Sequence, residues 1–221
     1  SIKLFEKGIQ GDIRSFLSGT NLLIVDVPPG LRKKPEINFV KKIENLIPYI
    51  EKSHLQRVIF TSSTSVFQDT DDFAVYDEHA TTDSSNDISV QLRNVELLFL
   101  NNENFNASIL RFGGLIGENR HPINHLSGKT EVKNPDAPIN LVHQEDCIKA
   151  ISKLIEKEKD NSVWNVVYPD HPPKKEYYSR IASERQLTPP EFDHSEPSKG
   201  KKISSEKLVK ELKFKFSQPI W

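Results

Sequence analysis

Short apolar runs alternate with amphipathic segments over most of the chain. The run "NLLIVDVPPG" at 21–30 ends in Pro-Pro-Gly, which predicts a strand buried on both faces and closed by a turn. The next segment, 36–52, carries apolar residues at helical spacing with charges opposite, so it predicts a helix. Its apolar positions are Ile37, Val40, Ile43, Ile47 and Ile50. Pro48 is expected to bend or shorten this helix.

The same alternation continues through the middle of the chain. "RVIF" at 57–60 predicts a second strand, and a loop rich in aspartate, serine and threonine follows over 68–87. A helix is expected from Ile88 to Leu100, and "NASILRF" at 106–112 predicts a third strand.

Two further strands enclose one more helix. The strands are "INLVH" at 139–143 and "SVWNVV" at 162–167, and the helix "QEDCIKAISKLIEKEK" covers 144–159. We expect the inward face of this helix to carry Ile148, Ile151, Leu154 and Ile155.

The last quarter of the chain changes character, because prolines punctuate two short helical patterns around 174–187 and 204–212. This pattern indicates a small C-terminal α/β lobe. The alternation of strand and helix before it predicts an α/β, Rossmann-like, doubly wound parallel sheet. We therefore expect a nucleotide-binding core at 1–120 and, at 121–221, a mixed segment that completes the sheet and forms the substrate lobe.

Composition excludes several classes of function. The formal net charge of -1 argues against a nucleic-acid partner, and no apolar run is long enough to cross a bilayer. The single cysteine, Cys147, permits no internal disulfide and falls inside an amphipathic pattern, so we interpret it as a buried packing residue. These features predict a cytoplasmic protein without a membrane segment.

Candidate chemistry collects where the predicted strands end. In a parallel sheet the carboxyl ends of the strands open into a ligand crevice. Hydroxyls there can donate and accept hydrogen bonds without charge, and glycine lets backbone approach a ligand closely. The residues delivered to this edge are Val27, Pro28, Pro29, Thr61, Ser62, Ser63, Thr64, Arg111, Gly113 and Gly114. Serine and threonine after a strand also commonly cap helices or form local turns, so both interpretations stay open.

Arginine and histidine in the "ENRHP" stretch give a second set of candidates. Arg120 and His121 fit a clamp for a substrate phosphate, although a surface arginine beside a turn is an equally good interpretation of Arg120. His121 and His125 are four residues apart, but Pro122 intervenes and no carboxylate or cysteine supports them, so we expect no metal site. His143 is either a general base or a hydrogen-bonded structural residue.

Several of these stretches together carry a family resemblance. "FTSSTSVF", "VPPG", "LRFGGLIGENRHP" and "NLVHQED" resemble the extended and atypical short-chain dehydrogenase/reductase superfamily, specifically bacterial NAD-dependent epimerase/dehydratase-like proteins. The resemblance runs from Ile9 to the end of the chain. It implies NAD or NADP as the cofactor, with Val27, Pro28 and Pro29 beside the adenosine half and the stretch after Arg111 beside the nicotinamide.

The resemblance also implies roles for individual residues. Ser63 occupies the position of the family's active-site serine, with Thr64 beside it, and Phe67 stands where tyrosine is usual. Asn140 and His143 lie in the element that matches "NLVHQED". In this family substrates are nucleotide sugars or similar phosphorylated compounds, and helices of the kind at 36–52 and 88–100 often form a homodimer.

Two family features are missing from the 221 residues. The G-x-G-x-x-G fingerprint is absent, so we expect that a first βαβ unit of a longer polypeptide is not included. No Tyr-x-x-x-Lys pair exists either: Ser89 stands near the tyrosine position and Leu92 near the lysine position. Without that proton relay, three hypotheses stay open: an epimerase, dehydratase or reductase, a non-catalytic dinucleotide-binding sensor or scaffold, and a fold that binds no dinucleotide.

Overall fold

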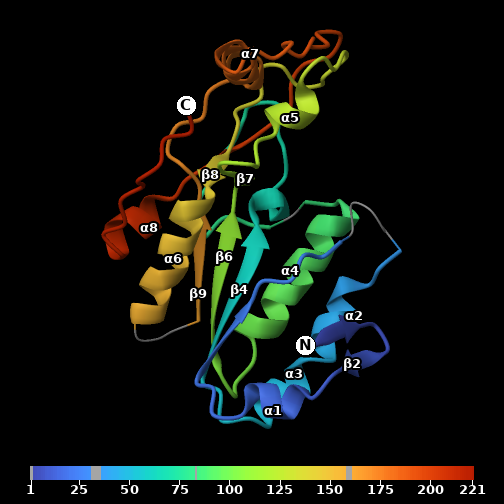
Figure 1. Cartoon of the computed structure of the whole chain (residues 1–221), viewed down its shortest axis with the longest axis vertical. Coiled ribbons are helices and arrows are strands. Elements are labelled where there is room, and N and C mark those ends of the chain that lie inside the picture. Colours follow the sequence, from blue (N-terminus) through green and yellow to red (C-terminus); the bar gives the residue numbers. More distant parts are fainter. Residues whose placement is uncertain (1, 31–35, 83, 158–160) are drawn as a thin grey trace. The chain divides into compact units, whose positions relative to one another are not determined.

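The computed structural model describes residues 2–30, 36–82, 84–157 and 161–221, and these form two compact units that interleave along the chain (Figure 1). Unit 1 comprises 1–66, 82–111 and 154–164, and unit 2 comprises 67–81, 112–153 and 165–221. The predicted division at residue 120 into a nucleotide-binding core and a substrate lobe stays a prediction.

Unit 1 is built on the main sheet, which has the strand order β3-β4-β6-β9. β3 pairs with β4 in parallel, with Leu22 opposite Arg57 and Val25 opposite Phe60. The elements of this unit are β1 (Lys3–Phe5), β2 (Gly8–Gln10), α1 (Ile13–Leu17), β3 (Leu22–Val25), α2 (Phe39–Glu44), α3 (Ile47–Glu51), β4 (Arg57–Ser63), η1 (Thr64–Val66), α4 (Asp87–Leu100) and most of β6 (Asn106–Phe112). The mixed α/β class with parallel pairing is therefore confirmed.

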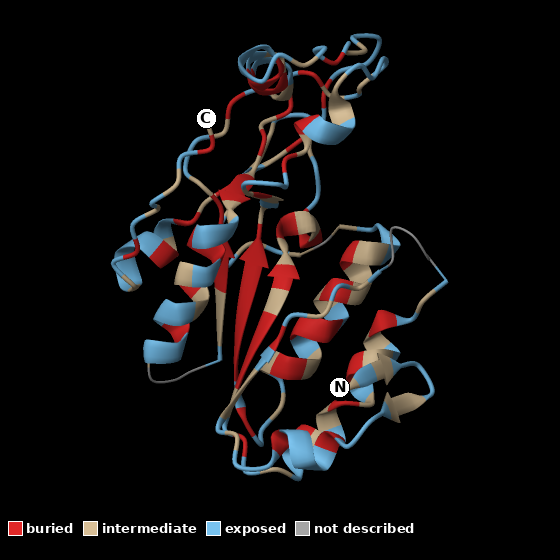
Figure 2. Ribbon diagram, in the orientation of Figure 1, coloured by how far each residue is buried: buried red, intermediate tan, exposed pale blue. Residues whose placement is uncertain are grey.

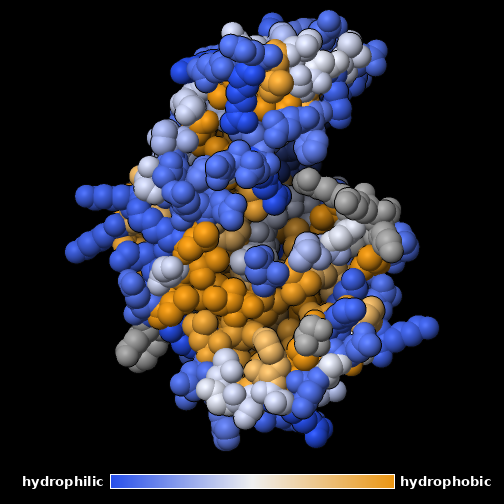
Figure 3. All heavy atoms as spheres, in the orientation of Figure 1, coloured by the Kyte–Doolittle hydropathy of each residue, from blue (hydrophilic) through white to orange (hydrophobic). Residues whose placement is uncertain are grey.

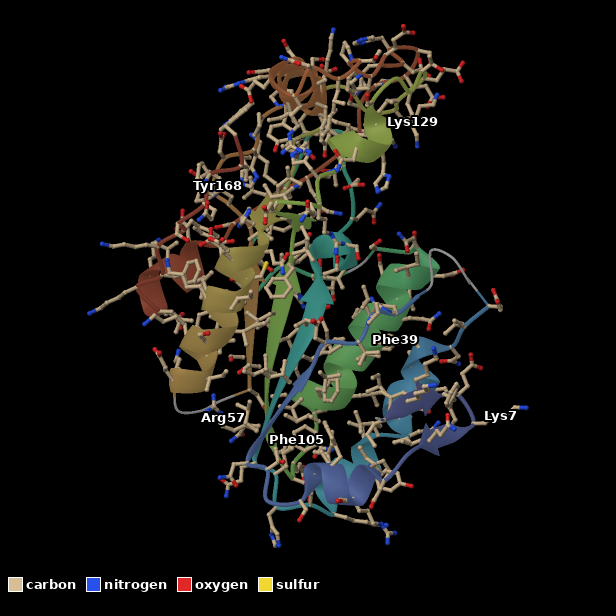
Figure 4. All side chains as sticks on the ribbon, viewed as in Figure 1. Lys7, Phe39, Arg57, Phe105, Lys129 and Tyr168 are labelled. Carbon is tan, nitrogen blue, oxygen red and sulfur yellow. The ribbon has the colours of Figure 1, made fainter. Side chains whose placement is uncertain are left out.

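A row of aromatic rings forms the core of unit 1. The ring of Phe60 in β4 lies 6.5 Å from that of Phe39 in α2 and 5.2 Å from that of Phe99 in α4. Phe105, just before β6, continues the row at 6.4 Å from Phe99 (Figure 4). These contacts place α2 and α4 on one face of the sheet. Both central strands are mostly buried, β6 in all but its first residue (Figure 2).

The opposite face of this sheet is covered less completely. Ile24 in β3 points there and is 39 % exposed, although its strand partner Ile59 is buried. Figure 3 shows apolar atoms gathered on the visible face of unit 1.

Unit 2 holds the remaining elements. They are β5 (Val75–Tyr76), β7 (Gly114–Ile116), α5 (Ile123–Leu126), β8 (Leu141–His143), most of α6 (Gln144–Glu156), α7 (Lys174–Glu184), β10 (Lys202–Ile203) and α8 (Glu206–Glu211), while β9 (Ser162–Val166) runs from unit 1 into unit 2. β7 and β8 form a parallel pair of their own, so the strand predicted at 139–143 exists but lies outside the main sheet.

Two details differ from the sequence-based expectation or refine it. The helix expected at 36–52 is two helices, because α2 ends at Glu44 and α3 begins with Pro48 in its first turn, as the proline predicted. The prediction of which residues form the inward face of α6 was partly wrong, since Ile148 and Ile155 are 55 % and 45 % exposed. Cys147, as predicted, is buried there, together with Ala150 and Leu154. The end of the predicted helix, 158–159, lies outside the described residues.

Candidate functional site

A carboxylate and a hydroxyl meet at the carboxyl ends of the first two strands of the main sheet. Asp26 follows β3 directly, and Thr61 lies one position beyond the residue of β4 that pairs with the last residue of β3. The Thr61 hydroxyl donates a hydrogen bond of 2.7 Å to Oδ1 of Asp26. Asp26 is exposed and Thr61 half-buried, so the pair is open to solvent. Sequence reasoning missed Asp26, although a single acidic residue closing an apolar run was a signal.

Ser62 points to the other face of β4, as the alternation of side chains along a strand requires. Its hydroxyl donates to Oε1 of Glu96 in α4 at 2.6 Å. Arg111 of β6 binds the same carboxylate, with Nη2 2.7 Å from Oε2 and Nε 3.1 Å from Oε1. All three residues are buried. The predicted cofactor contacts of Ser62 and Arg111 stay predictions, and the structure gives both residues a place in this buried ion-pair cluster.

The sequence contains a feature that indicates a buried role for Glu96, although Glu96 was not predicted as a site residue. It occupies the buried face of α4 together with Leu92, Val95 and Phe99. A charged side chain inside an apolar helical stripe requires a buried partner, because an unpaired charge in the core is costly.

Ser63 lies at the end of β4, and the turn η1 follows it at once. The backbone N–H of Ser65 donates to the Ser63 hydroxyl oxygen at 3.2 Å, which is a local serine turn. Ser63 is half-buried, and in the described parts of the chain its hydroxyl proton meets no acceptor. This hydroxyl can therefore donate a hydrogen bond to a ligand. Its neighbour Thr64 is buried.

Ser89 near the start of α4 is placed differently. Its hydroxyl donates to the backbone carbonyl of Ser65 at 2.6 Å, and the residue is 1 % exposed. The helix cap Asn86 holds its backbone N–H at 3.1 Å. The side chain of Ser89 therefore holds the backbone of the serine turn through the carbonyl of Ser65. Its predicted catalytic role stays a prediction.

The segment after β3 completes this edge of unit 1. Val27 and Pro29 are half-buried and Pro28 is exposed, in an irregular stretch that follows Asp26. The structure thus brings Asp26, Thr61 and the end of β4 together within unit 1, with the proline turn continuing from Asp26.

The glycines after Arg111 serve backbone packing within unit 2. A Cβ atom on Gly113 would lie 2.7 Å from the carbonyl oxygen of Asn140, and one on Gly114 would lie 2.8 Å from Cδ2 of Leu141. The N–H of Gly114 donates to that same Asn140 carbonyl at 2.7 Å. The close approach that the sequence indicated is therefore made to strand β8, and the predicted approach of cofactor to these glycines stays a prediction.

Asn140 also holds the C-terminal segment. Its Nδ2 donates to the carbonyl of Lys201 at 2.9 Å, and its Oδ1 accepts the N–H of Ile203 at 2.9 Å. Both ends of the amide are engaged by backbone, so its predicted substrate contact stays a prediction.

His121 is buried at 4 % exposure and belongs to a hydrogen-bonded chain. Nδ1 accepts the N–H of Ile123, so Nε2 carries the proton and donates to the Tyr177 hydroxyl at 3.0 Å. That hydroxyl in turn donates to the carbonyl of Ile220 at 2.6 Å. Burial, helped by the positive charge of Arg185, lowers the pKa of His121 to about 4.

The remaining candidate side chains differ in how far they are buried. Arg120 is exposed in a turn closed by hydrogen bonds between its backbone and that of Gly117. His143 is half-buried, and its Nδ1 accepts the N–H of Glu145 at 3.3 Å. Asp146 is fully buried in the first turn of α6 and accepts hydrogen bonds from Ser217 and Gln218.

The described residues contain no group of three or more histidine, cysteine, aspartate or glutamate side chains placed to hold a metal ion. No helix among them has the length and apolarity needed to span a bilayer.

Parallel strands joined by helices, with polar side chains gathered at the carboxyl ends of β3 and β4, define a Rossmann-like α/β protein. No established family profile matches the chain. The chain is 30 % identical to Protein YeeZ of Escherichia coli K12 over 206 residues, which are 92 % of this chain and 73 % of YeeZ, and the O157:H7 protein matches equally. The chain belongs to the same family as YeeZ.

Solved structures share the fold at low sequence identity. MoeE5 in complex with UDP-glucuronic acid and NAD superimposes with a TM-score of 0.78 at 17 % identity, over 96 % of this chain and 79 % of that one. UDP-N-acetylglucosamine 4-epimerase from Bacillus cereus gives 0.77 at 16 %, over 94 % and 76 % of the two chains. RMD from Pseudomonas aeruginosa, complexed with NADPH, gives 0.73 at 17 %, over 96 % and 83 %.

Proposed function

We propose that this protein binds NAD or NADP and acts as an epimerase, dehydratase or reductase on a nucleotide sugar or a similar phosphorylated substrate. Ser63 carries the proposal, because its hydroxyl stands at the carboxyl end of β4 and its proton meets no acceptor among the described residues. In this role Ser63, with Thr64 beside it, hydrogen-bonds the reacting oxygen of the substrate.

The neighbouring pair Asp26 and Thr61 supports a ligand at this edge. An exposed carboxylate held by a threonine hydroxyl is oriented in advance, so it can accept hydrogen bonds from ligand hydroxyls with little further ordering. Val27, Pro28 and Pro29 would border the adenosine half of the cofactor, and Arg120 would hold substrate phosphate. MoeE5, a protein of similar fold, is seen in complex with NAD and either UDP-glucuronic acid or UDP-glucose, and this supports the choice of ligands.

The cofactor part of the proposal is tested by thermal denaturation. A ligand that binds only the folded state raises the melting temperature, by an amount that grows with its concentration over Kd. We expect NAD or NADP together with UDP-glucose or UDP-glucuronic acid to stabilise the protein. YeeZ, measured in parallel, shows whether a relative that extends beyond the matched region binds more tightly.

A non-catalytic sensor or scaffold is the second candidate, and the position of Ser89 favours it. The Ser89 hydroxyl proton is already engaged with the carbonyl of Ser65, and the residue is 1 % exposed. A buried, engaged hydroxyl is badly placed to exchange a proton with substrate. Stabilisation by ligand without turnover would support the sensor.

We also propose a homodimer formed through α2, α3 and α4. Two adjoining hollows of about 440 and 500 Å³ lie along these helices and share Val40, Glu44 and Asn94. Leu97, on the outer side of α4, lines one of them and is 46 % exposed. A second copy of the chain would cover this apolar side chain.

A further inference from the structure

Two segments of unit 2 that are far apart in the sequence lie side by side. The N–H of Thr70 donates to the carbonyl of Gly200 at 2.8 Å, and the N–H of Gly200 returns a bond of 3.0 Å to the carbonyl of Thr70. β5 and β10 then pair in parallel, with Val75 opposite Lys202. The N–H of Ser204 extends the contact with a bond of 2.8 Å to the carbonyl of Tyr76. The loop 67–78 is thus hydrogen-bonded along much of its length to the segment 199–204.

Lys201 closes this contact with its side chain. Nζ donates to the carbonyl of Phe67 at 2.5 Å and lies 3.0 Å from Oδ1 of Asp69. The side chain of Lys201 is only 13 % exposed, so its ammonium depends on these two partners in place of water. A charge-assisted hydrogen bond in such a place is stronger than an exposed ion pair.

Lys199 provides the contrast within the same segment. Its Nζ lies 3.3 Å from Oδ1 of Asp71, and the two side chains are 63 % and 71 % exposed. Exposed pairs of this kind contribute little to stability. The two lysines differ in burial and in the bond of Lys201 to the carbonyl of Phe67, so Lys199 serves as the control for Lys201.

The segment is anchored from its other side, whereas the loop carries backbone strain. Asn140 grips the backbone of the segment through Lys201 and Ile203. Within the loop, the stacked rings of Phe67 and Tyr76, 5.0 Å apart, hold its two ends together. Phe73 has a φ of 55°, a left-handed conformation that is unfavourable for a residue with a side chain. The loop therefore needs its contacts to stay in this form.

We propose that residues 199–204 form a clamp that holds the loop 67–78 closed, and that Lys201 is the positioning residue that closes it. Phe67 is bonded to Val66, the last residue of the turn Thr64–Val66, so the clamp restrains the chain directly after the proposed site hydroxyls. The clamp exists whatever ligand the protein binds, whereas its effect on ligand binding rests on the proposed function.

Hydrogen exchange of the full chain, followed by mass spectrometry, tests the clamp. Lys201→Met should raise exchange in 67–78 by about tenfold, as expected when a local opening becomes easier, while Lys199→Met should leave it unchanged. Lys201→Arg keeps the charge and should restore part of the protection. Equal exchange in Lys201→Met and wild type, or an equal rise in Lys199→Met, would overturn the proposal.

A second variant covers the case in which Lys201→Met does not fold. Asp69→Asn removes only the ion pair and leaves the bond from Lys201 to Phe67, so exchange in 67–78 should rise by a smaller factor, about threefold. No rise with Asp69→Asn would count against the clamp. Binding of UDP-glucuronic acid is measured on the same variants: its absence in the wild type would bear on the proposed function, while the exchange rates would still decide the clamp.

Discussion

The guanidinium of Arg111 holds both carboxylate oxygens of Glu96, with Nη2 2.7 Å from Oε2, and their side chains are only 6 % and 2 % exposed. The hydroxyl of Ser62 completes the cluster. β6, α4 and β4 each contribute one residue, so this cluster ties the helix to the sheet next to the proposed site.

Removing one partner of this ion pair should strongly destabilise the protein. Glu96→Met removes the carboxylate that Nε and Nη2 of the buried guanidinium bind, and we expect a loss of about 3–5 kcal/mol in the free energy of unfolding. Glu96→Met combined with Arg111→Met should recover most of that loss, because no buried charge remains. Urea denaturation measures both. The exposed pair Lys210 and Glu206 is the control, and Lys210→Met should change stability by less than about 0.5 kcal/mol.

Stability should fall as the pH is lowered from about 6.5 to about 4, partly because of His121. Burial lowers the pKa of this imidazole to about 4 in the folded protein, whereas the unfolded chain takes up the proton near the ordinary value of about 6.5. Over that interval the unfolded state binds more protons, so acid favours unfolding. Melting temperatures across the interval should fall less steeply in His121→Gln. Parallel curves for both proteins would show that His121 does not contribute.

Gly113→Ala should destabilise unit 2 because the added methyl would lie 2.7 Å from the carbonyl oxygen of Asn140. Separating β7 from β8 to accommodate it should cost about 1–3 kcal/mol, as for other overpacked sites. Gly117→Ala is the matched control, since its nearest neighbour is the flexible end of Gln144 at 3.4 Å. Chemical denaturation should give a clearly lower free energy of unfolding for Gly113→Ala than for Gly117→Ala. Equal free energies of unfolding would contradict the role assigned to Gly113.

Leu97→Glu should weaken the proposed homodimer, because it would place a carboxylate in the apolar contact. Light scattering coupled to size-exclusion chromatography reports the mass in solution. Phe16→Glu, a change at a residue of α1 that is 58 % exposed, should leave the mass unchanged. A wild-type protein that stays monomeric at high concentration would rule out the proposed homodimer.

The sequence predicted best those elements whose pattern is local. Helix α4 and strand β6 fall within one residue of their expected bounds, because a continuous apolar stripe or run defines each. Residues 3–17, which form the hairpin β1–β2 and the helix α1, were not predicted, since their short elements carry too few residues for a periodic signal. Ile148 was placed on the wrong face of α6 because an isoleucine in an amphipathic pattern was assumed to be buried.

The candidate site was predicted in part. The run of hydroxyl residues was found because it directly follows the apolar run 57–60. In the structure β4 continues to Ser63, so strand alternation divides Thr61, Ser62 and Ser63 between the two faces of the sheet. Ser62 and Ser63 consequently differ in their surroundings, although they are neighbours. Long-range partners such as Asp26 with Thr61, or Lys201 with Phe67, depend on the tertiary fold and leave no mark in local periodicity.

The central claim is that the Ser63 hydroxyl donates to a bound ligand, and calorimetric titration of UDP-glucuronic acid in the presence of NAD tests it most directly. Ser63→Ala should weaken binding by about 2- to 10-fold, the loss expected for one hydrogen bond, while Ser65→Ala in the same turn should bind like the wild type. If Ser63→Ala binds as tightly as the wild type, or if both variants lose affinity equally, the ligand does not contact Ser63 and the proposed site is wrong.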